Sequence, residues 1–320
     1  MKKRTQENSL LNKLLIAIIF VTLGIYTVSM FFPLLWGLLT SLKSQGDFFL
    51  DKNVLGFPNL DPEIPWNSRE TCFELLNYKI VIDNFQLMVD VAKTTFYSAG
   101  KQVYHEATGG IAGIFANTFI YVFIGAFVNT IWPAVAAYAT AKFNFKFSNV
   151  LYTFLLITMI IPIVGSQSTT INVLQTLGIY DTWFGYIALK SMCTGMYYFV
   201  FYGFYKSLPD SYAEAAEIDG AGHWNILFRI VIPLSVKQLA TVWLVHFVGF
   251  WNDYQTPLLY LPSKPTLAYT VWYLTLGSVK LGDMPTMVAG TMTLALPILL
   301  VFIFLKNRLM GNVSIGGLKE

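Results

Sequence analysis

The stretch whose residue types and spacing point most clearly to a chemical role is 211–234, SYAEAAEIDGAGHWNILFRIVIPL. Glu214 and Glu217 are three residues apart, so a helix would present both carboxylates on one face. Their neighbours are small enough to let another backbone approach closely: Ala213, Ala215, Ala216, Gly220, Ala221 and Gly222. The chemistry indicated is recognition by an acidic, sterically open surface.

The same stretch predicts a helix, a turn and a second helix. We expect Ser207 to cap the first helix, with Pro209 in the first turn, where a missing N–H costs nothing. Gly220 can adopt the left-handed conformation that ends a helix, and a second helical run is expected over 223–232. We call residues 207–236 the elbow. The alternative is a solvated loop between two membrane helices.

Residue sets typical of catalysis are absent from the sequence. His105, His223 and His246 lie in three separate regions and have no metal-ligand spacing. Cys72 and Cys193 lie in unlike surroundings, so we do not expect them to pair. The phosphate-binding pattern G-x-x-x-x-G-K-[ST] does not occur, so any ATP hydrolysis must come from another chain. A membrane enzyme is therefore the weakest hypothesis.

The composition predicts an integral membrane protein, in which the elbow is a polar exception. Hydrophobic residues make up 55% of the chain and charged residues 12%, with a mean hydropathy of +0.55. The net charge of +3 is too small to indicate nucleic acid as a partner. Membrane lipid is the partner that this composition implies.

Apolar runs and basic flanks predict an all-α polytopic fold of six transmembrane helices with both termini in the cytoplasm. The predicted division is a cytoplasmic N-terminus (1–13), a first span (14–42), a large extracytoplasmic loop (43–110), a transmembrane core that contains the elbow (111–310) and a cytoplasmic tail (311–320). Within the extracytoplasmic loop, residues 84–97 are a candidate helix. No targeting peptide is predicted, because the first apolar run is too long for a signal core.

The second span is expected within the uncharged run 107–141, and the third from Phe147 to near Gln167. Three of the other predicted spans carry particular expectations. The fourth, about 183–205, has to include Lys190, whose amine we expect to snorkel outward. The fifth, starting near Lys237, has to carry Asp253 in its outer third. The sixth, about 287–305, contains Pro297.

The elbow resembles the EAA loop of ABC importer permeases. The shared pattern is Glu-Ala-Ala at 214–216, then Gly220, Ile230 and Ile232-Pro233, with isoleucine at 232 where the family usually has leucine. Other stretches are similar to the carbohydrate branch of these permeases, specifically the maltose-type second permease: 40–44, 47–49, 117–119, 136–143, 251–254, 257–259, 289–297 and 316–319. Residues 50–110 fall outside the resemblance, because this chain is longer there than typical members.

The resemblance implies a permease subunit in the cytoplasmic (inner) membrane of a prokaryote. Such a subunit pairs with a sister permease, sits on two ATPase subunits and receives a sugar or oligosaccharide from an extracytoplasmic binding protein. The chain itself would bind no cofactor, since ATP and Mg²⁺ would belong to the ATPase subunits.

The resemblance also assigns contacts to the ATPases. The elbow would be the coupling helix, making its contacts through Glu214, Ala215, Ala216, Asp219, Gly220 and Ala221. The tail would add contacts through Gly316, Gly317 and Lys319, although a frayed terminus is the simpler expectation for any last residues.

A second candidate set, Trp251, Asn252, Asp253 and Tyr254, could line a substrate path. Aromatic rings stack on sugar rings, amide and carboxylate groups bond hydroxyls, and unpaired polar groups in a span often line a cavity. Alternatively, Trp251 and Tyr254 anchor the helix at the membrane surface. The sequence leaves both readings open, and in maltose-type transporters the sister subunit can hold the sugar largely alone.

Two other transport functions fit the same sequence. One is the same kind of importer with another cargo, such as a glycerol-phosphate compound. The other is a stand-alone secondary transporter or channel that uses Lys190 and Asp253 as an ion-coupling pair, and its transport would survive ATP depletion.

Overall fold

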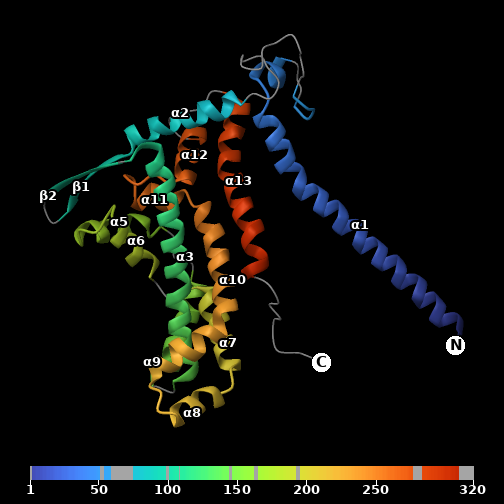
Figure 1. Ribbon diagram of the computed structural model, residues 1–320, viewed down its shortest axis with the longest axis vertical. Coiled ribbons are helices and arrows are strands. Elements are labelled where there is room, and N and C mark those ends of the chain that lie inside the picture. Colours follow the sequence, from blue (N-terminus) through green and yellow to red (C-terminus); the bar gives the residue numbers. More distant parts are fainter. Residues whose placement is uncertain are drawn as a thin grey trace. The chain divides into compact units, whose positions relative to one another are not determined.

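A computed structural model of the chain is built mostly of helices (Figure 1). It describes residues 2–50, 54–58, 75–98, 101–107, 109–143, 146–161, 165–191, 195–276 and 283–309. The chain divides into two compact units, which are described separately. One consists of Met1–Asp83 and Val279–Thr293, and the other of Asn84–Ser278 and Leu294–Glu320.

Within the part of the chain that the structure describes, four helical runs are long and apolar enough to cross a membrane. They are Asn12–Ser41 within α1 (Lys2–Ser41), α3 (Gly110–Lys142), His223–Trp251, and Met284–Phe304 within α13 (Met284–Leu309). A membrane core about 30 Å thick needs about 20 helical residues, a length that each run exceeds. The predicted first, second, fifth and sixth spans each overlap one of these runs.

The third and fourth predicted spans are not single continuous helices in the structure. The third contains α4 (Ser148–Ile160), and α5 (Gln167–Thr176) follows where an outer loop is predicted. The fourth is divided into α6 (Trp183–Lys190) and α7 (Met196–Ser207). Gly165 and Gly195 have positive φ angles of 79° and 118°, which a continuing right-handed helix does not allow. Six membrane crossings therefore stay a prediction.

The fifth span starts earlier than predicted. The helical run begins with α9 (His223–Ile226), passes through the π-helical turn η2 (Leu227–Val231) and continues as α10 (Ile232–Trp251). Pro233 is the second residue after the π-helical turn, where the hydrogen-bond pattern already changes and its missing N–H is tolerated. Asp253 consequently follows the end of the helix, and its predicted place in the outer third of the span is wrong.

The smaller unit is organised around Asn77 in α2 (Leu76–Val91). Its side-chain amide donates hydrogen bonds to the carbonyls of Ser41 and Lys43, both at 2.9 Å. Thr286 in α13 donates to the amide oxygen of Asn77 at 3.2 Å. Ser41 and Lys43 are buried, and the π-helical turn η1 (Gly46–Leu50) follows them in the chain. Asn77 thus ties the end of α1 to the start of α13.

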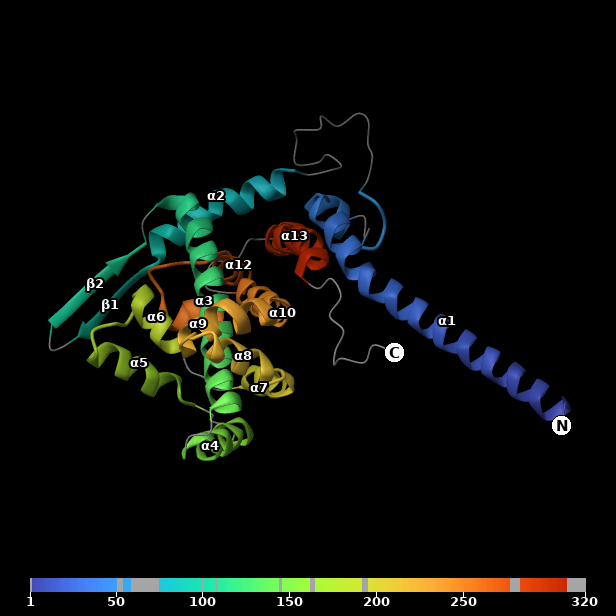
Figure 2. The ribbon, with the colours of Figure 1, turned by 60° about the horizontal axis from the view of Figure 1, so that its bottom comes forward.

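In the larger unit, α3 is the central helix and packs against α4, α6, α7, α10 and α12 (Figure 2). Its residue Thr140 hydrogen-bonds the hydroxyl of Tyr198 in α7 at 2.7 Å. The buried aromatic residues Tyr138, Tyr205 and Phe201 fill the same region. The elbow therefore packs against a core of aromatic side chains. Two short helices, α11 (Gln255–Tyr260) and α12 (Leu267–Leu276), follow α10.

A β-hairpin makes the predicted all-α class wrong in one region. β1 (Lys93–Ser98) pairs antiparallel with β2 (Lys101–Glu106), with Lys93 opposite Glu106. The candidate helix over 84–97 is right only to Val91, where α2 ends. The following stretch, KTTFYS, is β-branched and aromatic, which favours strand over helix.

Asp181 anchors this hairpin to the rest of the unit. Its carboxylate is buried, with the residue 1% exposed, and lies 2.9 Å from Nδ1 of His105 in β2. The backbone N–H of Ser263 donates to the same carboxylate at 3.2 Å. The amine of Lys264 lies 3.6 Å from Oδ1 and also donates to the Asp181 carbonyl. Three segments distant in sequence thus meet at one carboxylate.

Asp181→Asn is expected to loosen the hairpin and to lower the free energy of unfolding by about 2 kcal/mol. Asparagine tolerates the φ of 57° at this position, so the substitution removes the charge while preserving the backbone. Hydrogen exchange of residues 93–98 and 101–106 should become faster, whereas Asp90→Asn, at an exposed carboxylate on α2, should leave it unchanged. Equal protection in both variants would contradict this anchoring role.

Candidate functional site

The first helix of the elbow, α8 (Ser211–Ile218), ends in a Schellman turn. Gly220 has a φ of +80°, and its N–H donates to the carbonyl of Glu217 at 2.9 Å. The N–H of Ala221 donates to the carbonyl of Ala216 at 2.9 Å. The prediction that the helix ends at a left-handed Gly220 is confirmed. The space around this glycine is open, so its backbone conformation is what requires glycine.

The start of α8 differs from the prediction. Ser207 belongs to the last turn of α7, and its hydroxyl donates to the carbonyl of Phe204. α8 begins four residues later, at Ser211. The connection is held by Lys142 at the end of α3, whose amine donates to the carbonyl of Leu208 and lies 2.7 Å from Oδ1 of Asp210. A lysine from another helix therefore replaces the predicted local cap.

Lys142→Met should weaken this connection because it removes the amine but keeps an unbranched side chain that is one atom shorter. The Lys142 side chain is 16% exposed but that of Asp210 is 75% exposed, so we expect a loss of only about 1 kcal/mol of stability. Hydrogen exchange over residues 208–214 should become faster. Lys146→Met, at an exposed lysine just after α3, is the matched control, and an identical change in both would refute the role of Lys142.

The predicted coupling residues divide between two faces of the elbow. Glu214, Ala215, Asp219 and Gly220 are exposed, and Ala221 is half-buried. Ala216 instead is 8% exposed and belongs to the core around Tyr138 and Ile226. Residues two apart on a helix point to nearly opposite sides, so Glu214 and Ala216 cannot face the same partner.

The elbow also exposes apolar residues that our sequence analysis did not select. The exposed fractions are 87% for Ile218, 72% for Trp224, 60% for Phe228 and 51% for Tyr212. The rings of Trp224 and Phe228 stack with centroids 6.1 Å apart. The sequence does contain a signal for these residues, because they are large apolar side chains within an otherwise polar elbow. Large exposed apolar groups rimmed by charge are typical of protein–protein contacts.

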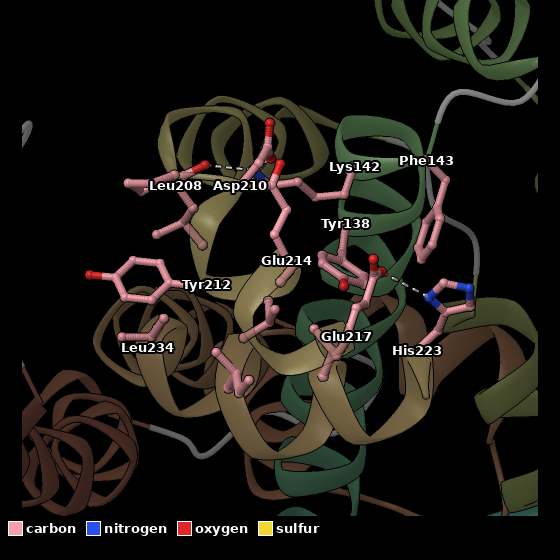
Figure 3. Close-up of a pocket in the computed structure, with 15 residues that line it drawn as sticks. Tyr138, Lys142, Phe143, Leu208, Asp210, Tyr212, Glu214, Glu217, His223 and Leu234 are labelled. Atoms are coloured by element: carbon pink, nitrogen blue, oxygen red, sulfur yellow. Dashed lines mark hydrogen bonds and ion pairs between the residues drawn. The ribbon is translucent and has the colours of Figure 1, made fainter. Parts of the chain in front are cut away.

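A cavity of about 210 Å³ lies between the end of α3, α8 and α9 (Figure 3). Glu214 and Glu217 line it, together with Phe143 and His223. Figure 3 shows the Glu217 carboxylate directed at His223, with Oε1 3.9 Å from Nδ1. The ring of Phe143 meets that of His223 edge to face at 5.2 Å. The elbow therefore combines an acidic hollow with exposed apolar side chains.

The four predicted substrate-path residues are consecutive but differ in burial, so they do not share one exposed surface. Trp251 is buried, and its indole N–H donates to the carbonyl of Leu294 at 3.0 Å. Asn252 is exposed and donates to the carbonyl of Val248 in its own helix. Trp251 is thus a core residue, which fits neither a sugar platform nor a surface anchor.

The other two residues also have structural partners. Asp253 accepts a 2.6 Å hydrogen bond from the hydroxyl of Tyr121 and a 3.0 Å hydrogen bond from the N–H of Thr256 at the start of α11. Tyr254 stacks on Trp272 with ring centroids 5.2 Å apart. The assumption that the polar groups of this set are unpaired is therefore wrong for Asp253.

Lys190 and the tail complete the predicted sites. The Lys190 amine lies 4.8 Å from the ring centroid of Phe250, a cation–π contact, instead of extending outward. Among the ion pairs of the described residues, none joins Lys190 to Asp253. Gly316, Gly317 and Lys319 lie outside the described residues.

Comparison with known families decides the class of this protein. Residues 134–308 match the family described as binding-protein-dependent transport system inner membrane component. The chain belongs to this family. The match contains the whole elbow, and it confirms the resemblance to ABC importer permeases seen in the sequence. The protein is therefore a multi-pass protein of the inner membrane.

Individual relatives agree with this family. The chain is 31% identical over 163 residues to the sn-glycerol-3-phosphate transport system permease protein UgpE of Yersinia pestis, a match that covers 50% of this chain and 58% of the relative. It is 28% identical over 212 residues to the diacetylchitobiose uptake system permease protein NgcG of Streptomyces coelicolor, covering 64% of this chain and 69% of the relative. The matched part thus spans little more than half of the first relative.

One solved structure shares the fold. It is the crystal structure of a bacterial ABC transporter involved in the import of the acidic polysaccharide alginate. A chain of it aligns with a TM-score of 0.67 at 18% identity, covering 93% of this chain and 95% of that chain. The likeness shows that the fold is that of an ABC transporter chain.

Proposed function

We propose that the chain is a permease subunit of an ATP-driven importer that takes up a sugar or oligosaccharide. The observation that carries this proposal is the exposed elbow, closed by Gly220, inside the region that matches the family. Its partners would be a sister permease, two ATPase subunits and an extracytoplasmic binding protein. ATP and Mg²⁺ would bind to the ATPase subunits and not to this chain.

The elbow is the proposed coupling helix. Glu214, Ala215, Asp219, Gly220 and Ala221 would contact the ATPase, while Ala216 packs α8 onto the core beneath them. In this proposal the chain crosses the membrane six times with both ends in the cytoplasm, and Gly316, Gly317 and Lys319 of the tail add to the ATPase contact.

Movement of the elbow has two routes into the transmembrane helices. The run from α9 through η2 into α10 is continuous, so a pull on α9 reaches the far end of α10. Lys142 ties the start of α8 to α3. ATPase closure would thereby rock α3 and α10 between inward-facing and outward-facing arrangements, and the docked binding protein would release its sugar into the cavity.

A glycerol-phosphate compound is the second candidate cargo, because one relative carries that name. Of the four residues proposed for a substrate path, Asn252 and Tyr254 are exposed and could meet a substrate. Trp251 and Asp253 would act by holding the helices around it. The solute that sustains growth through this transporter distinguishes the two cargoes.

The deciding experiment is a pull-down of the tagged chain from its native membranes, with identification of every protein that co-purifies. We expect an ATPase, a second permease and a solute-binding protein. Recovery of the chain alone, in a detergent that keeps other ABC complexes intact, would overturn the proposal. Uptake that persists after ATP depletion would point to a secondary transporter instead.

A further inference from the structure

A polar hollow of about 540 Å³ lies near the Gly110 end of α3. The elbow lies at the opposite end of this helix (Figure 1). Its volume falls within the range of about 300–1,000 Å³ that is usual for small-molecule sites. The hairpin, the start of α6 and the segment after α11 form its walls. The lining residues are Tyr104, His105, Glu106, Asn117, Asp181, Thr182, Trp183, Ser263 and Lys264.

Internal bonds hold the walls of this hollow in place. The buried Asp181 carboxylate joins His105, Ser263 and Lys264, as described above. The Thr182 hydroxyl caps α6 by accepting from the N–H of Gly185 at 3.0 Å. The hollow is therefore largely preformed, so a ligand would not have to order it.

Several polar groups still face the hollow after these bonds are made. Asn117 uses its amide N–H in a 3.3 Å bond to the carbonyl of Pro265, which leaves its amide oxygen as an acceptor. His105 uses Nδ1 toward Asp181, which leaves Nε2. Glu106 accepts from the Tyr104 hydroxyl through Oε2, which leaves its other oxygen. This set is rich in hydrogen-bond acceptors, and the ring of Trp183 adds a flat apolar face.

The charges of the lining favour a neutral ligand. Asp181 and Glu106 are acidic, while Lys264 is cationic and already occupied by Asp181 and the Ser263 hydroxyl. The hydrogen bond to Glu106 raises the pKa of Tyr104, so its phenol stays neutral. A phosphate would meet the Glu106 carboxylate, and the lysine among the described lining residues, Lys264, is already engaged by Asp181. A ligand with many hydroxyl donors and apolar C–H faces fits better.

We propose that this hollow is a binding subsite for a neutral saccharide at the outer mouth of the transporter. The Trp183 ring would stack on the sugar, and Asn117, His105 and Glu106 would accept hydrogen bonds from its hydroxyl groups. The subsite rests on the proposed function, because the topology proposed there puts this end of α3 outside. It would hold the sugar between its release by the binding protein and its entry into the membrane cavity.

The test is saturation-transfer NMR on the full chain in lipid nanodiscs. The probes are lactose and cellobiose, with glycerol 3-phosphate as the charged comparison. We expect transfer to both disaccharides, and a decrease of about fivefold in Trp183→Ala and in Asn117→Ala. Trp132→Ala and Asn129→Ala alter the same residue types at positions on α3 that do not line the hollow, and they should retain the transfer.

Three results would overturn the subsite: no transfer to either disaccharide, equal transfer in all four variants, or displacement of the disaccharides by glycerol 3-phosphate. The assay needs neither ATPase nor binding protein, so its outcome is separate from that of the pull-down. Absence of disaccharide binding together with an intact importer complex would remove only the subsite. Binding by a chain that purifies alone would keep the subsite and remove the importer.

Discussion

Gly220→Pro is expected to lower ATP-driven uptake at least about tenfold while the transmembrane helices stay folded. Proline fixes φ near −65°, whereas Gly220 has a φ of +80°. Proline also lacks the N–H that donates to the carbonyl of Glu217. Together these losses cost roughly 2–4 kcal/mol locally, which is more than a tenfold change in the population of the native turn.

The matched control is Gly222→Ala, two residues further along the same turn. Gly222 has an ordinary φ of −73°, and no atom lies within 4 Å of an added Cβ. Uptake into proteoliposomes that contain the assembled complex should therefore stay near the wild-type rate. Both variants should purify with the same helical content. Full uptake by Gly220→Pro would show that the elbow does not couple ATP hydrolysis to transport.

Local backbone chemistry explains why the sequence predicted some elements well. The end of α8 depends on one glycine and on bonds to residues within one turn, so its pattern is complete in the sequence. The long apolar helices α3 and α13 are specified by composition alone. The hydrogen bonds that such helices need are internal, and each helix is long enough to cross the membrane.

The mistaken predictions concern groups whose partners lie far away in the sequence. Lys142, not Ser207, holds the start of α8, across 66 residues of chain. Asp253 looked like an unpaired charge, but Tyr121 in α3 donates to it. Asp181 joins His105 and Lys264 from two other segments, so no local pattern marked the hairpin anchor. Tertiary partners of this kind cannot be read from spacing along one chain.

The two candidate sites lie at opposite ends of α3, and this arrangement suits a coupled importer. The elbow is joined to the Lys142 end, and the polar hollow includes Asn117 near the other end. α3 contains 33 residues, so the two sites are separated by most of a helix about 50 Å long. A tilt of α3 driven from the elbow would therefore displace a wall of the hollow.

Trp224→Ala is expected to weaken binding of the partner ATPase about 30-fold. Trp224 is 72% exposed in this chain, although burial of an indole is strongly favourable. A tryptophan at the centre of an interface commonly contributes about 2 kcal/mol or more when truncated, which corresponds to that decrease in affinity. The measurement is the affinity of the nanodisc-embedded complex, stripped of ATPase, for the ATPase identified in the pull-down.

Matched variants separate recognition by Trp224 from a structural role. Trp224→Phe keeps an aromatic ring that can stack on Phe228 and should recover most of the affinity. Phe184→Ala removes a ring that is 67% exposed on α6, away from the elbow, and should bind the ATPase normally. Because the Trp224 side chain is mostly exposed, its removal should leave the melting temperature nearly unchanged. Unchanged affinity in Trp224→Ala would restrict the ATPase contact to the acidic and small residues of α8. A large drop in melting temperature would instead show that Trp224 stabilises the fold of the elbow.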